Sequence, residues 1–428
     1  MDAKLAADLS RPSAPGGAQP HVAILFGSFR AGGIGRSVLR LATGLLERGC
    51  KVDLVVGRRY GQLLAAAPPA ATIVELARGS KLRSYGLALA ADPGGWRPLL
   101  ETAAPWRGAT GKLRYVHSFV DYLRAARPHA VLARTAPFGL VAGWARASSG
   151  MPCRVVTSEH GSLDSDEKGS GGWDYGLSHG LRARAYGLAD ALVAVSGGVA
   201  DEMAARTGIA RESIEVIYNP VVDDDFARRA AEPVSHPWFA PGEPPVILGV
   251  GALKPVKDFP TLVRAFARVR ERRPARLVIL GDVRGGSKDT DHVSELKALP
   301  EQLGVAADVD FPGFASNPMA HMARAACFVL SSRSEGLGNV LIEALASGCP
   351  VVSTACWGGP PEILADGAYG PLVPVGDDAA MAEAIAAVLD APLPRERLIA
   401  RGDEFTVGRA VDRHLELALA HPTLARAA

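Results

Sequence analysis

The sequence lacks several features that would on their own place a protein in a class. Cysteine is scarce: the five cysteines are odd in number and have no C-x-x-C spacing, which favours a reduced, cytosolic protein over a disulfide-bonded one. No run of about 18 apolar residues occurs, so no membrane span is expected. Asp2 stands near the N-terminus without an apolar segment behind it, so no secretory signal is expected. The net charge is only +2, which leaves no global polyanion-binding signature.

What is present is an ordinary globular composition with one uneven distribution of charge. The 428 residues are 48% hydrophobic and 21% charged, and the chain is too long for one core, so two domains are expected. Between Arg78 and Arg154, twelve basic residues stand against three acidic ones, a local excess of nine positive charges. This segment is either a solvated surface or attracts an anionic membrane or acidic acceptor, at about 1 kcal/mol per basic residue. No motif supports binding to nucleic acid.

Alternating strand and helix patterns predict an α/β fold. Residues 1–19 are rich in alanine, proline and glycine and are expected to form a disordered tail. A strand (22–26), a helix of 3.6-residue period (38–46) and a second strand (52–56) then make a βαβ unit, the signature of a parallel sheet. Further strands are expected at 130–132, 155–157, 191–195, 214–218, 246–250, 277–280, 309–311, 328–330 and 351–352.

The chain is predicted to divide into two Rossmann-like domains. Five prolines between residues 231 and 245 indicate an interdomain linker. We therefore place the first domain at 20–235 and the second at 236–403.

The most informative segment is residues 335–343, where two glutamates stand eight positions apart across the expected start of a helix. A strand precedes it and a turn and a second strand follow, which is where open α/β sheets bind ligands. Gly336 and Gly338 let a ligand approach the backbone, and free N–H groups at the helix start suit a diphosphate. Glu343 is placed to accept hydrogen bonds from a ribose diol, and Glu335 stays in the loop. Two merely solvated glutamates are the weaker interpretation.

Three further groups are expected to face this segment. Lys257 follows the first strand of the second domain and can neutralise a leaving diphosphate. The Gly32–Gly33 turn before a helix resembles a phosphate loop, although it does not match G-x-G-x-x-G. His160 stands at the carboxyl end of a strand and could hydrogen-bond a sugar hydroxyl. A surface lysine, an ordinary turn and a histidine that caps a turn are the alternatives.

Together these motifs resemble those of the GT-B retaining glycosyltransferases of family 4. The family pattern runs from a Gly-Gly loop through a strand-end histidine to G-R-L-x-x-x-K, E-x7-E and G-x-P-V-V. Nearly the whole chain is covered, although the match is loose between residues 57 and 150, where acceptors are expected to bind. The resemblance implies two Rossmann-like domains that face each other across a cleft, the first completed by a C-terminal helix within 404–428.

The resemblance also implies how single residues would hold a nucleotide-sugar donor. Glu343 would bind the ribose, Lys257 would stabilise the diphosphate, and Glu335 would contact the transferred sugar. His160 and Gly33 would close the site from the first domain. Leu337, Gly338 and Asn339 would meet phosphate or sugar through their backbone, and Lys254, Arg284, Gly313, Phe314 and Gly336 complete the expected donor-binding set.

One position departs from the family pattern. The family usually has an arginine where this chain has Ala252, so half of the expected cation pair is absent. Lys254 or Arg284 could substitute, or the leaving group is held less tightly. Our hypothesis from the sequence is that Lys254 compensates.

The resemblance implies a retaining glycosyltransferase that requires neither a metal nor another cofactor. The donor is expected to be a nucleotide diphosphate sugar, by likeness UDP-linked, and the acceptor a lipid-linked or cell-envelope glycan at the cytoplasmic face of a membrane. Acidic groups at 164–166, 223–225 and 289–291 lie in polar loops and are interpreted as surface acids rather than a D-x-D metal site. The alternatives are a sugar-nucleotide 2-epimerase on the same fold and a non-catalytic nucleotide-sugar-binding protein.

Overall fold

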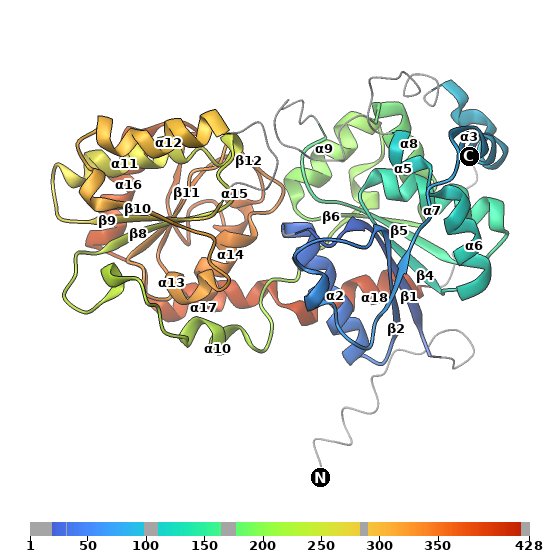
Figure 1. Cartoon of the computed structure of the whole chain (residues 1–428), viewed down its shortest axis with the longest axis horizontal. Coiled ribbons are helices and arrows are strands. Elements are labelled where there is room, and N and C mark those ends of the chain that lie inside the picture. The colour runs from blue at the N-terminus through green and yellow to red at the C-terminus, as the bar shows by residue number, and fades with distance from the viewer. Residues whose placement is uncertain (1–18, 31, 98–109, 164–176, 283–289, 421–428) are drawn as a thin grey trace, which may run out of the picture.

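The computed structural model describes residues 19–30, 32–97, 110–163, 177–282 and 290–420 of the chain. These residues form two α/β halves that lie side by side along the long axis of the molecule (Figure 1). Each half is a parallel sheet with helices on both faces. The α/β fold with two Rossmann-like sheets, which the sequence predicts, is therefore confirmed.

The first sheet has seven parallel strands in the order β3-β2-β1-β4-β5-β6-β7. Its strands are β1 (His21–Ser28), β2 (Lys51–Arg58), β3 (Thr72–Glu75), β4 (Ala130–Arg134), β5 (Arg154–Glu159), β6 (Ala191–Ala194) and β7 (Ile214–Val216). The helices of this half are α2 (Gly33–Glu47), α3 (Lys81–Ala91), α5 (Thr110–Leu113), α6 (Val116–Ala126), α7 (Ala136–Ser149), α8 (His179–Gly187) and α9 (Gly197–Thr207).

The second sheet has six parallel strands in the order β10-β9-β8-β11-β13-β15. Its strands are β8 (Val246–Val250), β9 (Arg276–Leu280), β10 (Val309–Gly313), β11 (Cys327–Leu330), β13 (Val351–Thr354) and β15 (Leu372–Val373), and a separate pair is formed by β12 (Ser334–Glu335) and β14 (Trp357–Gly358). The helices of this half are α10 (Phe226–Ala231), α11 (Phe259–Arg270), α12 (Thr290–Gln302), α13 (Pro318–Met322), α14 (Asn339–Ala346), α15 (Pro360–Ile363), α16 (Asp378–Asp390) and α17 (Arg395–Gly402). The last helix of the chain, α18 (Val407–Leu419), returns to the first half.

The central strands are buried on both faces. In β1 the residues from Val22 to Leu25 are completely inaccessible, and in β9 the residues from Leu277 to Ile279 are as well. Parallel strands covered by helices on both sides read as continuous apolar runs rather than alternating ones. This is why such strands were the easiest elements to predict.

Two segments cross between the halves, and they are hydrogen-bonded to each other. The amides of Val221 and Val222 donate to the carbonyl of Phe405, and the amide of Val407 donates to the carbonyl of Val222. After the second crossing, α18 packs on α2, where Val411 fills the space beside Gly44. The C-terminal helix thus lies against the first sheet, although it follows the second in sequence.

The proline-rich segment interpreted as a linker is packed rather than free. The His236 ring lies 2.9 Å from the carboxylate of Asp310 at the edge of the second sheet. The guanidinium of Arg276 stacks 4.8 Å from the ring centre of Trp238. The sequence interpretation weighed the prolines and not the aromatic anchors between them, and the linker and the boundary at residue 235 stay predictions.

None of the helices in the described part of the chain combines the length and apolar character that a membrane crossing requires.

Candidate active site

The centre of the site is a contact between Lys257 and Glu335. The Lys257 ammonium donates to Glu335 Oε1 at 2.5 Å, and the Ser332 hydroxyl donates to the same oxygen at 2.7 Å. Ser331, just after β11, donates to the Lys257 carbonyl at 2.7 Å and thereby fastens the lysine loop to the end of that strand. Two groups that are 78 positions apart in sequence thus meet at the carboxyl edge of the second sheet.

Glu335 lies in a short strand, not in the loop that the sequence predicted. In β12 it pairs with Gly358 of β14. A Cβ atom on Gly358 would lie 1.6 Å from the Glu335 carbonyl oxygen, and its φ of 106° also requires glycine. The pairing holds the Glu335 backbone in place more firmly than an open loop would.

Helix α14 begins where the sequence predicted, at Asn339. Gly338 precedes it in the left-handed conformation, with φ at 95°, and no side chain caps the helix start. The first backbone N–H groups of a helix have no partner within it, and the helix dipole favours an anion there. The start of α14 therefore suits a phosphate group.

Glu343 is almost completely buried one turn into α14. Only 2% of its surface is exposed, and its Oε1 lies 3.6 Å from the guanidinium of Arg40 on α2. Its Oε2 is buried and has no hydrogen-bond partner among the residues that the structure describes. A buried carboxylate oxygen without a donor is costly, so this atom is a candidate acceptor for a ligand hydroxyl.

The first half meets the site through backbone contacts. A Cβ atom on Gly336 would lie 2.1 Å from the His160 carbonyl oxygen, so only glycine permits this approach. Ser196 donates to the Gly336 carbonyl at 2.7 Å. On α2, Gly33 faces the Asn339 amide at 3.6 Å from its ideal Cβ position. These contacts place His160 beside Gly336 and Gly33 beside Asn339, and their roles toward a donor stay predictions.

The His160 imidazole is held in its neutral form. Its Nε2 lies 3.0 Å from the Ser158 hydroxyl. Burial lowers its pKa well below the usual value of 6.5, and the nearby guanidinium of Arg134 lowers it further. At neutral pH this ring can exchange hydrogen bonds with a neutral partner but carries no charge.

Other predicted donor-binding residues lie at the margin of the site. The Gly281 amide donates to the Gly313 carbonyl at 2.8 Å, which places Gly313 at the carboxyl edge of the second sheet. Phe314 beside it is 64% exposed. Lys254 is half-buried in the turn before Lys257. Arg284 lies outside the described residues.

Several residues of the site were not found from the sequence. Ser332 and Arg40 are two of them, and Glu362 is a third: it accepts from the Gly197 amide at 2.8 Å and from the Tyr218 hydroxyl at 2.6 Å. Arg40 and Glu362 make their contacts over long sequence separations, whereas Ser332 lies only three positions from Glu335. Ser196 had a usable signal, because a serine between a strand and a helix is typical of an N-cap.

The carboxylate and histidine side chains bear on whether a metal could bind. Within the described ranges, no three or more histidine, cysteine, aspartate or glutamate side chains come together as a metal site would need. In the acidic run 223–225, Asp223 pairs with Arg229 and Asp225 with Arg228, which fits their interpretation as structural acids. The acids at 164–166 and Asp289 lie outside the described residues. That no metal is required stays a prediction.

Comparison with known proteins adds the family. Residues 31–225 match the model of Glycosyltransferase Family 4, and residues 233–405 match that of Glycosyl transferases group 1. The lipopolysaccharide core biosynthesis glycosyltransferase LpsE of Rhizobium meliloti is 35% identical over 187 residues, which are 42% of this chain and 52% of LpsE. The N-acetylgalactosamine-N,N'-diacetylbacillosaminyl-diphospho-undecaprenol 4-alpha-N-acetylgalactosaminyltransferase of Campylobacter jejuni is 34% identical over 182 residues, 42% of this chain and 46% of that protein.

The whole fold also has solved counterparts. HepE of Anabaena in complex with UDP superposes with a TM-score of 0.71 at 19% identity, over 93% of this chain and 99% of HepE. The sequence matches span about half the length of the curated relatives. The two family models together cover most of the chain, which therefore belongs to the family 4 glycosyltransferases of the GT-B fold.

Proposed function

We propose that this protein is a retaining glycosyltransferase that moves a sugar from a nucleotide diphosphate sugar to a glycan acceptor. The observation that carries the proposal is the joint placement of the Lys257–Glu335 pair and the uncapped start of α14 at one edge of the second sheet. A ribose, a diphosphate and a sugar occupy such a site in that order from Glu343 outward. Family membership supports the same reaction class.

The proposed roles follow from charge and reach. The diphosphate lies at the start of α14, where Lys257 stabilises the negative charge that grows on the leaving group. The unpartnered Oε2 of Glu343 accepts a ribose hydroxyl. Glu335 lies beside the transferred sugar, and the neutral His160 hydrogen-bonds one of its hydroxyls. Retention of configuration, as the family resemblance implies, uses front-side attack in which the donor phosphate takes the acceptor proton.

The finer substrate assignment rests on the relatives. HepE was solved with UDP, and this supports a UDP-linked donor. The names of LpsE and of the Campylobacter jejuni enzyme refer to lipopolysaccharide core and to diphospho-undecaprenol, which support a lipid-linked or cell-envelope acceptor. The comparisons do not favour a 2-epimerase or a non-catalytic binding protein.

A hollow in the first half offers room for the acceptor. It has a volume of about 460 Å³ and lies at the carboxyl ends of β2 and β3, between Arg58, Glu75, Arg78 and Tyr115. This edge of the sheet is where α/β folds place their ligands. The two arginines suit an acceptor that carries phosphate.

Donor binding can be tested without knowing the acceptor. We expect a UDP-sugar, in a panel with GDP- and ADP-sugars, to raise the melting temperature, because a ligand at about 100 times its Kd stabilises by about 2.7 kcal/mol. Glu343→Gln should lose most of this shift, since it removes the charge that would accept the ribose hydroxyls. Glu383→Gln, on the exposed surface of α16, is the matched control and should keep it. A panel without any shift would refute the proposal.

We propose that only a small part of the basic segment, the surface near α3, contacts a membrane. Lys112 and Arg134 are buried, and Arg107 lies outside the described residues, so the whole segment cannot face a membrane. Near α3, however, Leu82 is 87% exposed and Trp96 is 48% exposed. Exposed basic residues flank them, namely Lys81, Arg83 and Arg97. Apolar and basic side chains together suit an anionic lipid surface, at the cytoplasmic face in our proposal.

Vesicle binding tests this surface. Leu82→Glu should lower co-sedimentation with vesicles that contain anionic phospholipid by about tenfold. The substitution replaces a leucine that would insert into the lipid with a carboxylate that the anionic headgroups repel. Co-sedimentation with neutral vesicles should be weak for both proteins. Leu303→Glu, at an exposed leucine of the second half, serves as the control. Equal sedimentation of the Leu82 variant and the parent protein would contradict the assignment.

A further inference from the structure

One face of α2 is directed at the second half. Gly33 faces Asn339, Ser37 donates to the Asn219 side chain at 3.2 Å, and Arg40 lies 3.6 Å from Glu343. Residues at i, i+4 and i+7 of a helix share one side of it. Arg36, one turn after Gly33 and one turn before Arg40, belongs to the same side. Along the helix, Arg36 lies between Gly33, which faces Asn339, and Arg40, which faces Glu343.

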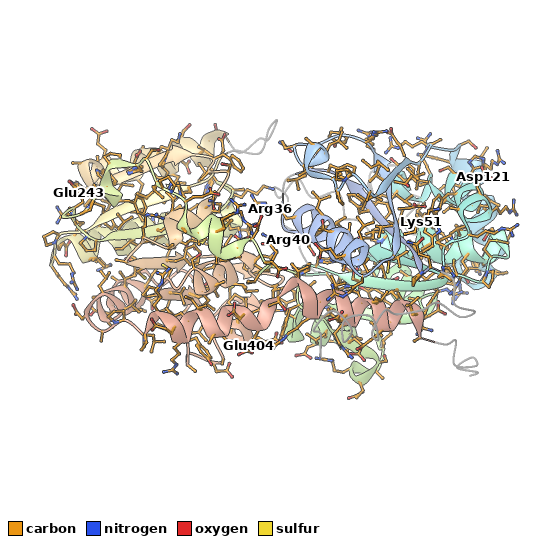
Figure 2. All side chains as sticks on the ribbon, turned by 90° about the horizontal axis from the view of Figure 1, so that it is seen from below. Arg36, Arg40, Lys51, Asp121, Glu243 and Glu404 are labelled. Carbon is orange, nitrogen blue, oxygen red and sulfur yellow. The ribbon has the colours of Figure 1, made fainter. Side chains whose placement is uncertain are left out.

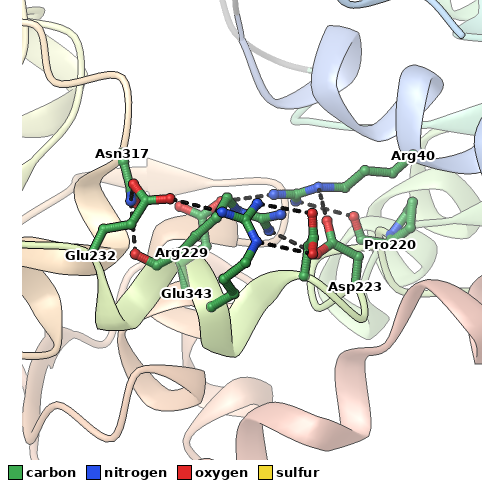
Figure 3. Close-up of polar contacts among 9 residues, drawn as sticks. Arg40, Pro220, Asp223, Arg229, Glu232, Asn317 and Glu343 are labelled. Atoms are coloured by element: carbon green, nitrogen blue, oxygen red, sulfur yellow. Dashed lines mark hydrogen bonds and ion pairs between the residues drawn. The ribbon is translucent and has the colours of Figure 1, made fainter.

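The two arginines of this face differ in their partners. Arg40 is fully engaged: besides Glu343 it donates to the Pro220 carbonyl at 3.3 Å and lies 3.7 Å from Asp223 (Figure 3). Asp223 in turn accepts from Arg229 at 2.8 Å, so the chain of charges ends in a balanced network. Arg40 therefore has little capacity left for a ligand.

Arg36 is half-buried and has no such partner. Neither a hydrogen bond nor an ion pair joins its side chain to any residue in the described ranges; its amide alone is used, to the Gly32 carbonyl within the helix. Figure 2 shows Arg36 and Arg40 on the side of α2 that faces the second half. A partly desolvated guanidinium without a counter-ion is unfavourable and is a ready site for an anion.

In the second half, the position of one cation in the family pattern is occupied by an uncharged residue. The family pattern has an arginine five residues before the lysine, where this chain has Ala252. The ammonium group of Lys257 forms an ion pair with Glu335. Lys257 therefore has one negative partner already, and a second positive charge for a diphosphate at the start of α14 could come from Lys254 or from the first half.

We propose that Arg36 supplies this second cation from the first domain and binds the terminal phosphate of the nucleoside diphosphate. The inference rests on the proposed function and names a further donor-binding residue within it. A guanidinium presents two parallel N–H donors and suits phosphate oxygens better than an ammonium does. Because Arg36 stands on one half and Lys257 on the other, the diphosphate bridges the two halves, and the leaving group is neutralised only when they are together.

The test compares ligands that differ by one phosphate. Binding of UDP, UMP and uridine to the parent protein and to Arg36→Ala is measured by calorimetry, with GDP/GMP and ADP/AMP as parallel arms. We expect Arg36→Ala to lower the affinity for the diphosphate about 10- to 100-fold. The affinities for the monophosphate and the nucleoside should change by no more than about twofold. Arg36→Lys should recover part of the loss. The ligand-free melting temperature should not fall, because no described contact is removed.

Controls separate this proposal from its rivals and from the proposed function. Arg264→Ala, at an exposed arginine of α11, removes one charge elsewhere and should leave all affinities unchanged. If Lys254→Ala weakens the diphosphate selectively and Arg36→Ala does not, the sequence hypothesis on Lys254 holds and Arg36 is excluded. An equal loss for UDP and UMP in Arg36→Ala would also overturn the proposal. If no nucleoside diphosphate binds the parent protein, the proposed function fails together with it.

Discussion

Glu335→Gln is expected to lower the turnover of the donor by about 100-fold or more, with only a small change in donor affinity. The carboxylate is joined to Lys257 at 2.5 Å and to Ser332 at 2.7 Å, so its charge and position are set before a donor arrives. A charge held rigidly beside the reacting sugar acts mainly in the transition state, and losing one such group typically costs a factor of 10² to 10³. The amide keeps the size and loses the charge.

The measurement is release of nucleoside diphosphate from the donor that the thermal-shift panel selects, with the acceptor present. Glu383→Gln makes the same chemical change on the exposed surface of α16 and should leave the rate unchanged. A rise in KM with an unchanged kcat would mean that Glu335 binds the donor equally well in the ground state and in the transition state. That result would remove Glu335 from the proposed chemistry.

Gly336→Ala is expected to lower kcat/KM by about 100-fold through a single added methyl group. The new Cβ atom would stand 2.1 Å from the His160 carbonyl oxygen, and a backbone atom cannot yield as a flexible side chain can. The two halves must then separate by about 1 Å, and a misplacement of that size can cost about 10² in rate. The backbone angles of Gly336 are open to alanine, so the loss arises from the contact between the halves.

Gly161→Ala is the matched control, since no atom lies within 4 Å of its ideal Cβ position although it is next to His160. It should retain the activity and the melting temperature of the parent protein. For Gly336→Ala, small-angle scattering should report a larger radius of gyration, while each half stays folded. Full activity in Gly336→Ala would show that the close packing of His160 on Gly336 is not the state that reacts.

The strands and the start of α14 could be predicted because the physical signal is local. A continuous apolar run such as Val22 to Leu25 identifies a strand covered on both faces, and glycines before Asn339 mark a helix start that a ligand can approach. The expectation that Lys257 faces the 335–343 segment followed because both stand at the carboxyl ends of strands in one parallel sheet, whereas the Lys257–Glu335 ion pair itself was not predicted. The family resemblance named the same residues independently.

Elements without a local signal were not predicted. Helix α7 is buried on nearly all sides, so its apolar residues do not follow a 3.6-residue period. The short β12–β14 pair depends on Gly358, whose fit against Glu335 is visible only in three dimensions. The packing of residues 231–245 was not predicted either, because proline density indicates a linker whether or not aromatic side chains anchor it.

Sequence alone was sufficient for the two α/β sheets and for the glutamates at 335 and 343, because each depends on residues close together in the chain. The missing cation at Ala252 came from the resemblance to the family pattern. The folded molecule was needed to show what faces them. Arg40 engages Glu343, while the side chain of Arg36 has no polar partner among the residues that the structure describes. The difference arises from how α2 of one half is oriented against α14 of the other, and no periodicity within either segment encodes that orientation.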